Sequence, residues 1–137
     1  MMNINSFRIS EFKKQQLRYQ VQRMIAKAPT EIELKRDVIL LDEFNGKTRK
    51  PITVGKIEVF LGKEYGYDKV SHEGDPSGYV KTLNRLYILS VWEEEYEYKF
   101  NDYFYLHGLK HRIIYPKNND DIYWECDIEV ILPNDKS

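Results

Sequence analysis

The fold of this chain is decided by residues 122–132, which read IYWECDIEVIL. The even positions are apolar throughout, whereas Glu125, Asp127 and Glu129 occupy odd positions between them. Side chains alternate between the two faces of a β-strand, so this pattern predicts a strand with one buried face and one wet face. Cys126 falls in the apolar row, where we expect it to pack rather than to react.

Five stretches upstream also have the composition or the alternation of strands. Turn residues separate them, with Asn45-Gly46-Lys47 after the first stretch and Gly108 between the last two. Gly55 is a candidate position for a β-bulge, and residues 116–121 read as a polar loop. Strands that turn about every ten residues predict an antiparallel β-barrel or sandwich over residues 30–132. The five stretches are residues 31–41, 52–61, 83–92, 103–106 and 110–115.

One helical pattern precedes the strands, in residues 6–28. Its apolar residues recur at the spacing of one helix face: Leu17, Val21, Met24, Ile25 and Ala28. Either Ser6 or Ser10 is a suitable N-cap, and Pro29 prevents the helix from continuing. At this length we expect a single domain, residues 1–137, that is mainly β with one N-terminal α-helix.

The charge is divided unevenly between the helix and the rest of the chain. Residues 1–28 contain six Lys or Arg and one Glu, which gives +5, so the other 109 residues carry −6 of the total of −1. A basic segment joined to an acidic body suits contact with an acidic partner, although a solvated helix face gives the same pattern. The candidate partner-contact residues on the helix are Lys13, Lys14, Arg18 and Arg23.

Residues 62–82 break the strand pattern with four glycines and a proline. We expect a long inserted loop here, and loops of this length in a small domain are usually functional or disordered. Aromatic and cationic residues in the loop are candidates for contact with a channel or a partner: Tyr67, Lys69, His72, Tyr79 and Lys81.

The sequence gives only weak signals of a catalytic or metal-binding site. His107 and His111 have the spacing of metal ligands on a helix, but they flank Gly108 in a predicted hairpin that offers no third ligand. We interpret them as partly exposed histidines near a turn. Glu93-Glu94-Glu95 and Asp120-Asp121 read as solvated turns, and no phosphate-binding or nucleophile motif occurs. We therefore expect no enzymatic activity, no cofactor and no metal site.

Cysteine content and hydropathy set expectations about the compartment. Cys126 is the only cysteine, so the chain has no intrachain disulfide and suits a reducing compartment. No stretch approaches the roughly 20 apolar residues that cross a bilayer, and the first residues lack the apolar core of a signal peptide. We expect a soluble protein that is made in a cytoplasm and does not contact a membrane.

Several segments follow one another in a recognisable order: Ala28-Pro29-Thr30, Glu31-Ile32-Glu33-Leu34-Lys35-Arg36, Phe44-Asn45-Gly46, Val54 to Phe60, Asn101-Asp102-Tyr103-Phe104-Tyr105, Gly108 to Ile113, Tyr123 and Asp127-Ile128-Glu129. This order resembles the head-closure, or stopper, proteins of tailed phages, including those of defective PBSX-type prophages. The resemblance covers most of the chain, as a spacing of hydrophobic and turn residues without a chemical motif.

The resemblance implies a β-barrel that assembles into a homo-oligomeric ring, a dodecamer, in the neck of the virion. The ring would sit between the portal or adaptor protein and the tail terminator or tail tube, after synthesis in the host cytoplasm. In such proteins a long loop projects into the central channel and helps to retain the packaged DNA. The matching segment here runs from Gly66 to Lys81.

Three other functions remain open on the sequence. A tail-completion or terminator protein would belong to the same connector. A stand-alone single-stranded nucleic-acid-binding β-barrel would use exposed aromatics to stack bases, but the aromatic-rich residues 92–105 are acidic. A small enzyme would require a pocket with converging titratable groups.

Overall fold

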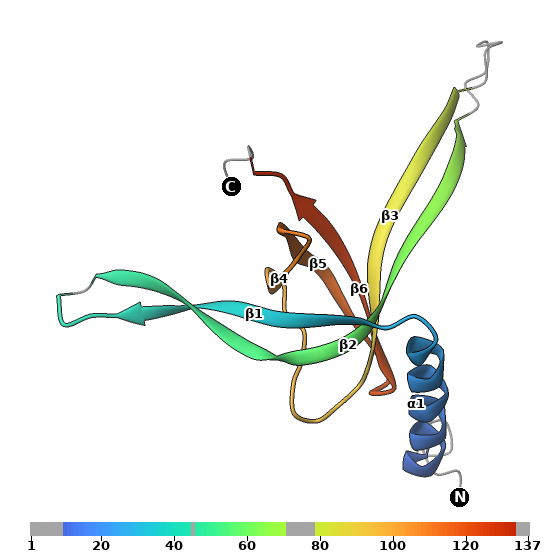
Figure 1. Ribbon diagram of the computed structural model, residues 1–137, viewed down its shortest axis with the longest axis horizontal. Helices are drawn as coiled ribbons and strands as arrows, with labels where there is room; N and C mark the ends of the chain where they lie inside the picture. Colours follow the sequence, from blue (N-terminus) through green and yellow to red (C-terminus); the bar gives the residue numbers. More distant parts are fainter. Residues whose placement is uncertain (1–9, 45, 71–78, 134–137) are drawn as a thin grey trace, which may run out of the picture.

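The computed structural model describes residues 10–44, 46–70 and 79–133, with the backbone alone over residues 65–70 and 79–83. One helix and six strands make up this part of the chain (Figure 1). They are α1 (Glu11–Ala26), β1 (Thr30–Leu41), β2 (Lys47–Val70), β3 (Tyr79–Val91), β4 (Tyr103–Leu106), β5 (Leu109–Asn119) and β6 (Tyr123–Ile131).

The strands form a closed antiparallel barrel in the order β1-β2-β3-β6-β5-β4. Closure is narrow, because β1 meets β4 through the single pair Lys35 and Tyr103. The prediction of a mainly β fold with an antiparallel barrel and an N-terminal helix is therefore confirmed.

The core fills the interior of the barrel with side chains from every strand. The alternation predicted for residues 122–132 is confirmed as far as Ile128, since Trp124, Cys126 and Ile128 of β6 are all buried. It fails at the end of the stretch, where Leu132 lies beyond the strand and is 55% exposed. Phe104 of β4 and Ile88 of β3 are completely buried beside them. Burial of apolar surface is the dominant favourable contribution to folding, so these inward rows hold the barrel together.

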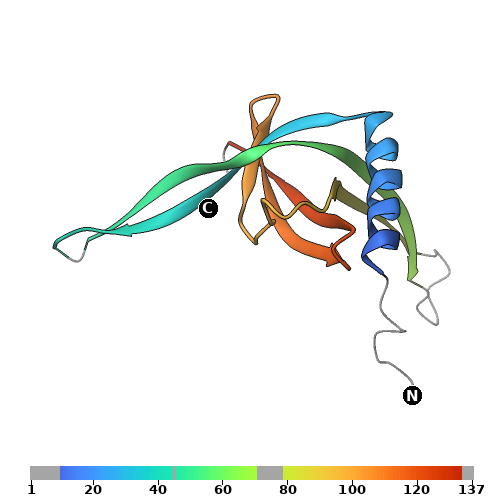
Figure 2. The ribbon, with the colours of Figure 1, turned by 90° about the horizontal axis from the view of Figure 1, so that it is seen from below.

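A β-bulge near the barrel wall redirects the first hairpin. Leu34 pairs with Gly55 and Lys35 pairs with Thr53, so Val54 is the extra residue. The bulge lies next to Gly55, as expected, and bulges bend a strand and increase its twist. Beyond it, residues 36–41 and 47–52 stay paired and leave the barrel as a long hairpin (Figures 1 and 2).

The loop predicted for residues 62–82 is wrong over most of its length. β2 continues to Val70 and β3 begins at Tyr79, and the two strands pair without interruption along this second hairpin. Gly62 lies opposite Tyr87, and a Cβ at Gly62 would approach the Tyr87 ring to 2.3 Å. The glycine thus makes room for a cross-strand aromatic ring rather than breaking the strand. Residues 71–78 lie outside the described part of the chain.

The loop predicted for residues 116–121 is also shorter than expected, because β5 extends to Asn119. A second bulge at Ile114 precedes this extension, since Ile113 pairs with Ile128 and Tyr115 with Asp127. The turn itself spans the three residues from Asp120 to Ile122, and the φ angles of Asp120 and Asp121 are 53° and 57°. Aspartate tolerates this left-handed region better than most residues do.

Helix α1 packs beside the barrel against β3 and β2, at the opposite end of the molecule from the tip of the β1–β2 hairpin (Figures 1 and 2). The Ser10 side chain caps it by accepting a hydrogen bond from the Lys13 amide. The helix ends at Ala26, before the Ala28 predicted, and Ser6 lies outside the described residues. Ile25 is its buried residue, whereas Met24 is exposed, so the packed face is narrower than predicted.

Candidate assembly surfaces

The outer part of the β1–β2 hairpin, residues 36–52, is called the apolar arm here. Five of its large apolar side chains are exposed, by 40% to 89%: Ile39, Leu40, Leu41, Phe44 and Ile52. Scattered single exposed apolar residues are ordinary, but a group of them on one projecting element marks an interaction surface. The arm therefore has the composition of an element that is buried in an assembly.

The tip of the apolar arm is organised by its own hydrogen bonds. The Asp42 carboxylate accepts hydrogen bonds from the amides of Phe44 (2.9 Å) and Gly46 (2.6 Å). The Asp42 amide donates to the Gly46 carbonyl oxygen at 3.0 Å. A Cβ on Gly46 would lie 2.4 Å from the Asp42 carboxylate, so a larger residue would displace that carboxylate from its hydrogen bonds. These hydrogen bonds restrict the described part of the tip, and a restricted surface loses less entropy on binding.

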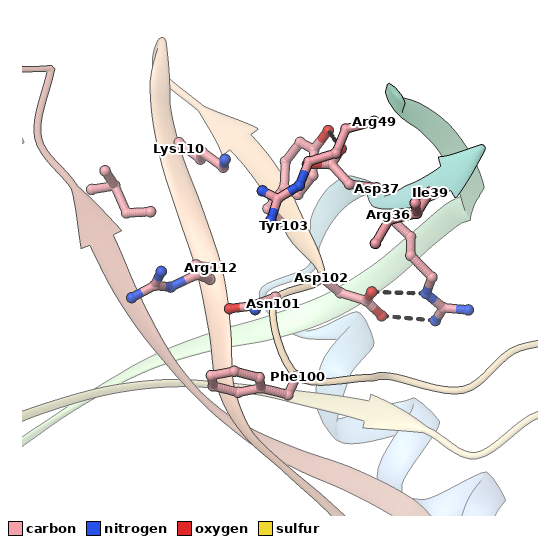
Figure 3. A pocket seen from close by; sticks show the side chains of 11 residues that line it. Arg36, Asp37, Ile39, Arg49, Phe100, Asn101, Asp102, Tyr103, Lys110 and Arg112 are labelled. Carbon is pink, nitrogen blue, oxygen red and sulfur yellow. Dashed lines mark hydrogen bonds and ion pairs between the residues drawn. The ribbon is translucent and has the colours of Figure 1, made fainter. Parts of the chain in front are cut away.

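A cavity of about 330 Å³ lies at the base of the apolar arm, between the arm and the β4–β5 hairpin (Figure 3). We call it the basic cavity, because four cationic side chains line it and only two acidic ones do. The cations are Arg36, Arg49, Lys110 and Arg112, and the acids are Asp37 and Asp102.

The strongest contact in the basic cavity is the ion pair between Arg36 of β1 and Asp102, just before β4. The Nε and Nη2 atoms of the Arg36 guanidinium each donate to one carboxylate oxygen of Asp102 at 2.8 Å (Figure 3). Asp102 is 1% exposed and also accepts the Lys99 amide at 2.8 Å. The hydrogen bonds between Arg36 and Asp102 raise the pKa of the Arg36 guanidinium, so Arg36 stays cationic. Because Arg36 is the first residue of the arm, the pair fixes the direction in which the arm leaves the barrel.

Tyr103 links the same two elements a second time. Its hydroxyl donates to the Asp37 carboxylate at 2.7 Å, and the Lys110 ammonium lies 4.3 Å from the centre of its ring. Burial, together with the hydrogen bond to Asp37, raises the pKa of Tyr103 to about 12. Arg112 pairs with Glu129 of β6. These contacts tie the cavity wall together.

A second cavity, of about 500 Å³, is called the acidic cavity here. Five acidic residues line it, from the connection between β3 and β4 and from the turn before β6: Glu93, Glu94, Glu95, Glu97 and Asp121. Trp92, Tyr96 and Trp124 supply an aromatic wall. The Trp124 indole N–H is buried and has no hydrogen-bond partner within the described residues. This surface combines negative charge with apolar rings.

The sequence-based candidates on helix α1 differ in their surroundings. Arg18 donates to the Asp121 carbonyl oxygen at 2.7 Å and to Glu11 at 2.9 Å, and it stacks over Trp92 at 4.5 Å. It holds the helix against the barrel, so its donors are largely used within the chain. Lys13 and Arg23 are exposed, and Lys14 is half-buried.

The candidates in residues 62–82 are brought together only in part. Tyr67 and Lys69 belong to β2, and Tyr79 and Lys81 belong to β3, which places these four on the outer part of one hairpin. In the backbone register Tyr67 lies opposite Thr82. His72 lies outside the described residues. Sequence reasoning missed the apolar arm, whose available signal was the apolar run at residues 38–41, followed by Phe44, just before the predicted turn at residues 45–47.

The histidines and the cysteine hold structural positions. His107 lies in the β4–β5 turn with a φ of 52°, and it is exposed as expected. His111 is buried, contrary to our interpretation, because its ring stacks on Phe104 at 5.2 Å in the packed face of β5. Burial raises the pKa of the Cys126 thiol to about 12, which keeps it protonated.

The described residues contain neither a metal-binding cluster nor a membrane-spanning helix. Over residues 10–44, 46–70 and 79–133, no three His, Cys, Asp or Glu side chains are grouped so that they could hold a metal ion. Within the same ranges, no helix has both the length and the hydropathy of a membrane-spanning segment.

Comparisons with known proteins give a weak structural likeness and no sequence match. No family model matches the chain, and no curated protein sequence matches it either. Among solved structures, a chain in the virion of a native gene transfer agent particle is similar at a TM-score of 0.45 and 11% sequence identity. The match covers 74% of this chain and 94% of that chain. A likeness of this size does not assign a function, so the proposed role rests on the chain's own surfaces.

Proposed function

We propose that this protein is a structural subunit of a tailed-phage or phage-like virion, in which it forms the head-closure ring of the head–tail connector. The single observation that supports this role best is the apolar arm. It projects from a closed barrel and leaves five large apolar side chains exposed. Burying such a side chain stabilises a complex by about 1.5–3 kcal/mol relative to leaving it in water. An arm of this kind is therefore favoured inside an assembly.

The two hairpins support contact with more than one neighbour. The β1–β2 hairpin and the β2–β3 hairpin leave the barrel in different directions (Figure 1). In a ring, one of them is free to reach an adjacent subunit while the other reaches a different component or the channel. We assign the outer part of the β2–β3 hairpin, with Tyr67, Lys69, Tyr79 and Lys81, to the channel side. There its lysines would help to retain packaged DNA by charge attraction.

The role is tested in particles of the phage or prophage whose genome encodes the chain. We expect mass spectrometry of purified particles to detect the protein, and electron microscopy to place it at the neck. Deleting its gene should give filled heads that do not join tails and that lose their DNA. Absence of the protein from the particles would contradict the proposal.

The same deletion separates head closure from tail completion. A tail-completion or terminator protein predicts heads that keep their DNA, together with tails of abnormal length or tails that fail to attach. Shortening the β2–β3 hairpin by deleting residues 68–79 tests the channel role separately. If such particles neither leak DNA nor fail to join tails, the channel assignment is wrong while the connector role stands.

The basic cavity favours one alternative, a stand-alone single-stranded nucleic-acid binder. Arg49 and Lys110 line this cavity without a carboxylate partner within the described side chains. A phosphate-binding protein would show DNA affinity as a monomer, and the affinity would fall steeply with salt. A connector subunit would instead assemble in the absence of DNA.

A further inference from the structure

We infer that the tip of the apolar arm of one copy docks into the acidic cavity of the next copy. This inference rests on the proposed assembly role and deepens it by naming the two surfaces that meet. The occupant of the cavity is a second copy of this chain, and the contact joins unlike surfaces of the two copies. Repetition of such a head-to-tail contact produces a closed ring when its rotation closes, and a filament when it does not.

The arm tip offers an aromatic anchor with cations beside it. Phe44 is 89% exposed and Leu41 is 73% exposed, so both rank among the most exposed large apolar residues of the described chain. Residues 41–50 contain Lys47, Arg49 and Lys50 against Asp42 and Glu43, a net charge of +1. Asp42 is occupied by the hydrogen bonds of the turn. The surface left for a partner is therefore apolar with a positive flank.

The acidic cavity offers the complementary surface. Its five acidic residues outnumber its one cation, Arg36, which already pairs with Asp102 at 2.8 Å. Trp92, Tyr96 and Trp124 give it an aromatic wall that suits a phenyl ring. Its volume of about 500 Å³ is that of a pocket able to take a side chain.

One feature of the cavity favours a cationic occupant. Glu93, Glu94 and Glu95 are consecutive and exposed, and like charges at this spacing repel one another unless a cation lies near them. A docked arm brings cations to the glutamates and apolar side chains to the aromatic wall.

The geometry of one molecule favours contact between copies. The arm projects away from its own barrel (Figure 1), whereas the cavity lies in the barrel wall around the connection from β3 to β4. The contact therefore gives each copy one donor surface and one acceptor surface. A chain with both surfaces intact propagates the assembly, and a chain that lacks either one ends it.

Charge reversal tests the docking directly. Lys47→Glu with Lys50→Glu makes the arm acidic, and Glu93→Lys with Glu94→Lys and Glu95→Lys makes the cavity basic. We expect each variant alone to remain unassembled in sedimentation velocity, because its arm and its cavity then carry charge of the same sign. Mixing the two variants should restore assembly, because each arm then meets a cavity of opposite charge. One chain that carries all five changes should also assemble.

Controls separate docking from folding and from a general effect of charge. Lys27→Glu with Lys63→Glu changes the charge by as much as the arm variant does, at exposed positions outside the arm and the acidic cavity, and should leave assembly unchanged. Circular dichroism of every variant should match that of the wild type, since all of these positions lie at the surface. Mixing a Glu43→Cys chain, which keeps the Phe44 anchor, with a Glu95→Cys chain should give a disulfide-linked dimer of the two, which neither chain forms with itself.

The outcomes distinguish the docking from the proposed function. If the wild type assembles but the mixture of reversed variants does not, or if each reversed variant assembles alone, the docking is wrong and the assembly role stands. Failure of the two cysteine chains to cross-link within a wild-type-like assembly also overturns the docking. If the wild type stays monomeric at every concentration, both the docking and the assembly role are wrong.

Discussion

At the scale of single residues, one buried ion pair determines where the projecting element begins. Arg36 starts the apolar arm, and Asp102 precedes β4 at the point where the barrel closes. Closure by strand pairing is limited to Lys35 and Tyr103 at this seam. The pair of charges therefore replaces much of the backbone pairing that a longer seam would provide.

Arg36→Leu should destabilise the protein by about 3 kcal/mol, since removing one partner leaves the other buried and uncompensated. Urea unfolding followed by circular dichroism measures the loss. Lys99→Leu is the matched control, because Lys99 is 56% exposed and pairs with the equally exposed Glu97. Its effect should stay below about 1 kcal/mol. Equal effects of the two substitutions would show that the buried pair does not support the seam.

Cys126 should make stability depend on pH above neutrality. Burial raises the pKa of its thiol from 9.0 to about 12, so the folded state keeps the proton longer than the unfolded state does. The resulting contribution, on the order of 4 kcal/mol, is complete below pH 9 and is lost as the pH rises toward 12. Cys126→Ala should therefore lose stability less steeply over this range in urea titrations. Identical slopes for the two proteins would contradict the assignment.

Residue burial was predictable where a strand alternates and was not predictable elsewhere. Cys126 follows a regular apolar row, so its packed position was correctly expected. His111 was expected to be partly exposed because it lies near a glycine turn. Its place opposite Phe104 across the β4–β5 hairpin buries it instead. Cross-strand neighbours depend on register, which a single sequence does not reveal.

At the scale of elements, the two hairpins differ most from the sequence-based expectation. Residues 62–70 and 79–82 were expected to form a loop because glycines interrupt their pattern, yet they pair as strands. Ladder hydrogen bonds between long strands outweigh the weak strand propensity of isolated glycines. For the β1–β2 hairpin, the strands and the turn were predictable. The exposure of this hairpin was not predictable, because it depends on the direction that the bulge at Val54 gives to the two strands.

Helix α1 should depend on Arg18 for its position. Arg18→Ala removes the stacking on Trp92 and the hydrogen bond to the Asp121 carbonyl oxygen, which should destabilise the docked helix by about 1–2 kcal/mol. Hydrogen exchange of the α1 amides measures this effect directly. Arg23→Ala on the same helix is the control, since Arg23 is exposed. Equal protection in both variants would mean that Arg18 does not anchor the helix.

At the scale of the whole molecule, the barrel and the helix followed from periodicity, while the assembly surfaces required the structure. The chain was correctly expected to be mainly β with an N-terminal helix. The acidic cavity combines residues 92–97 with Asn118, Asp121 and Trp124, which are distant in the sequence. Such a site exists only once β3, β5 and β6 are in register. The sequence therefore indicated the architecture better than the surfaces on which function depends.

The central claim is that the apolar arm drives assembly, and native mass spectrometry over a range of protein concentrations tests it most directly. The decisive variant replaces residues 39–49 by Asn-Gly, which joins the paired residues Val38 and Lys50 through a two-residue turn of the kind that closes hairpins. We expect the wild type to form one discrete closed oligomer, and the shortened protein to stay monomeric with an unchanged thermal transition. A wild type that remains monomeric, or a shortened protein that assembles as the wild type does, would contradict the claim.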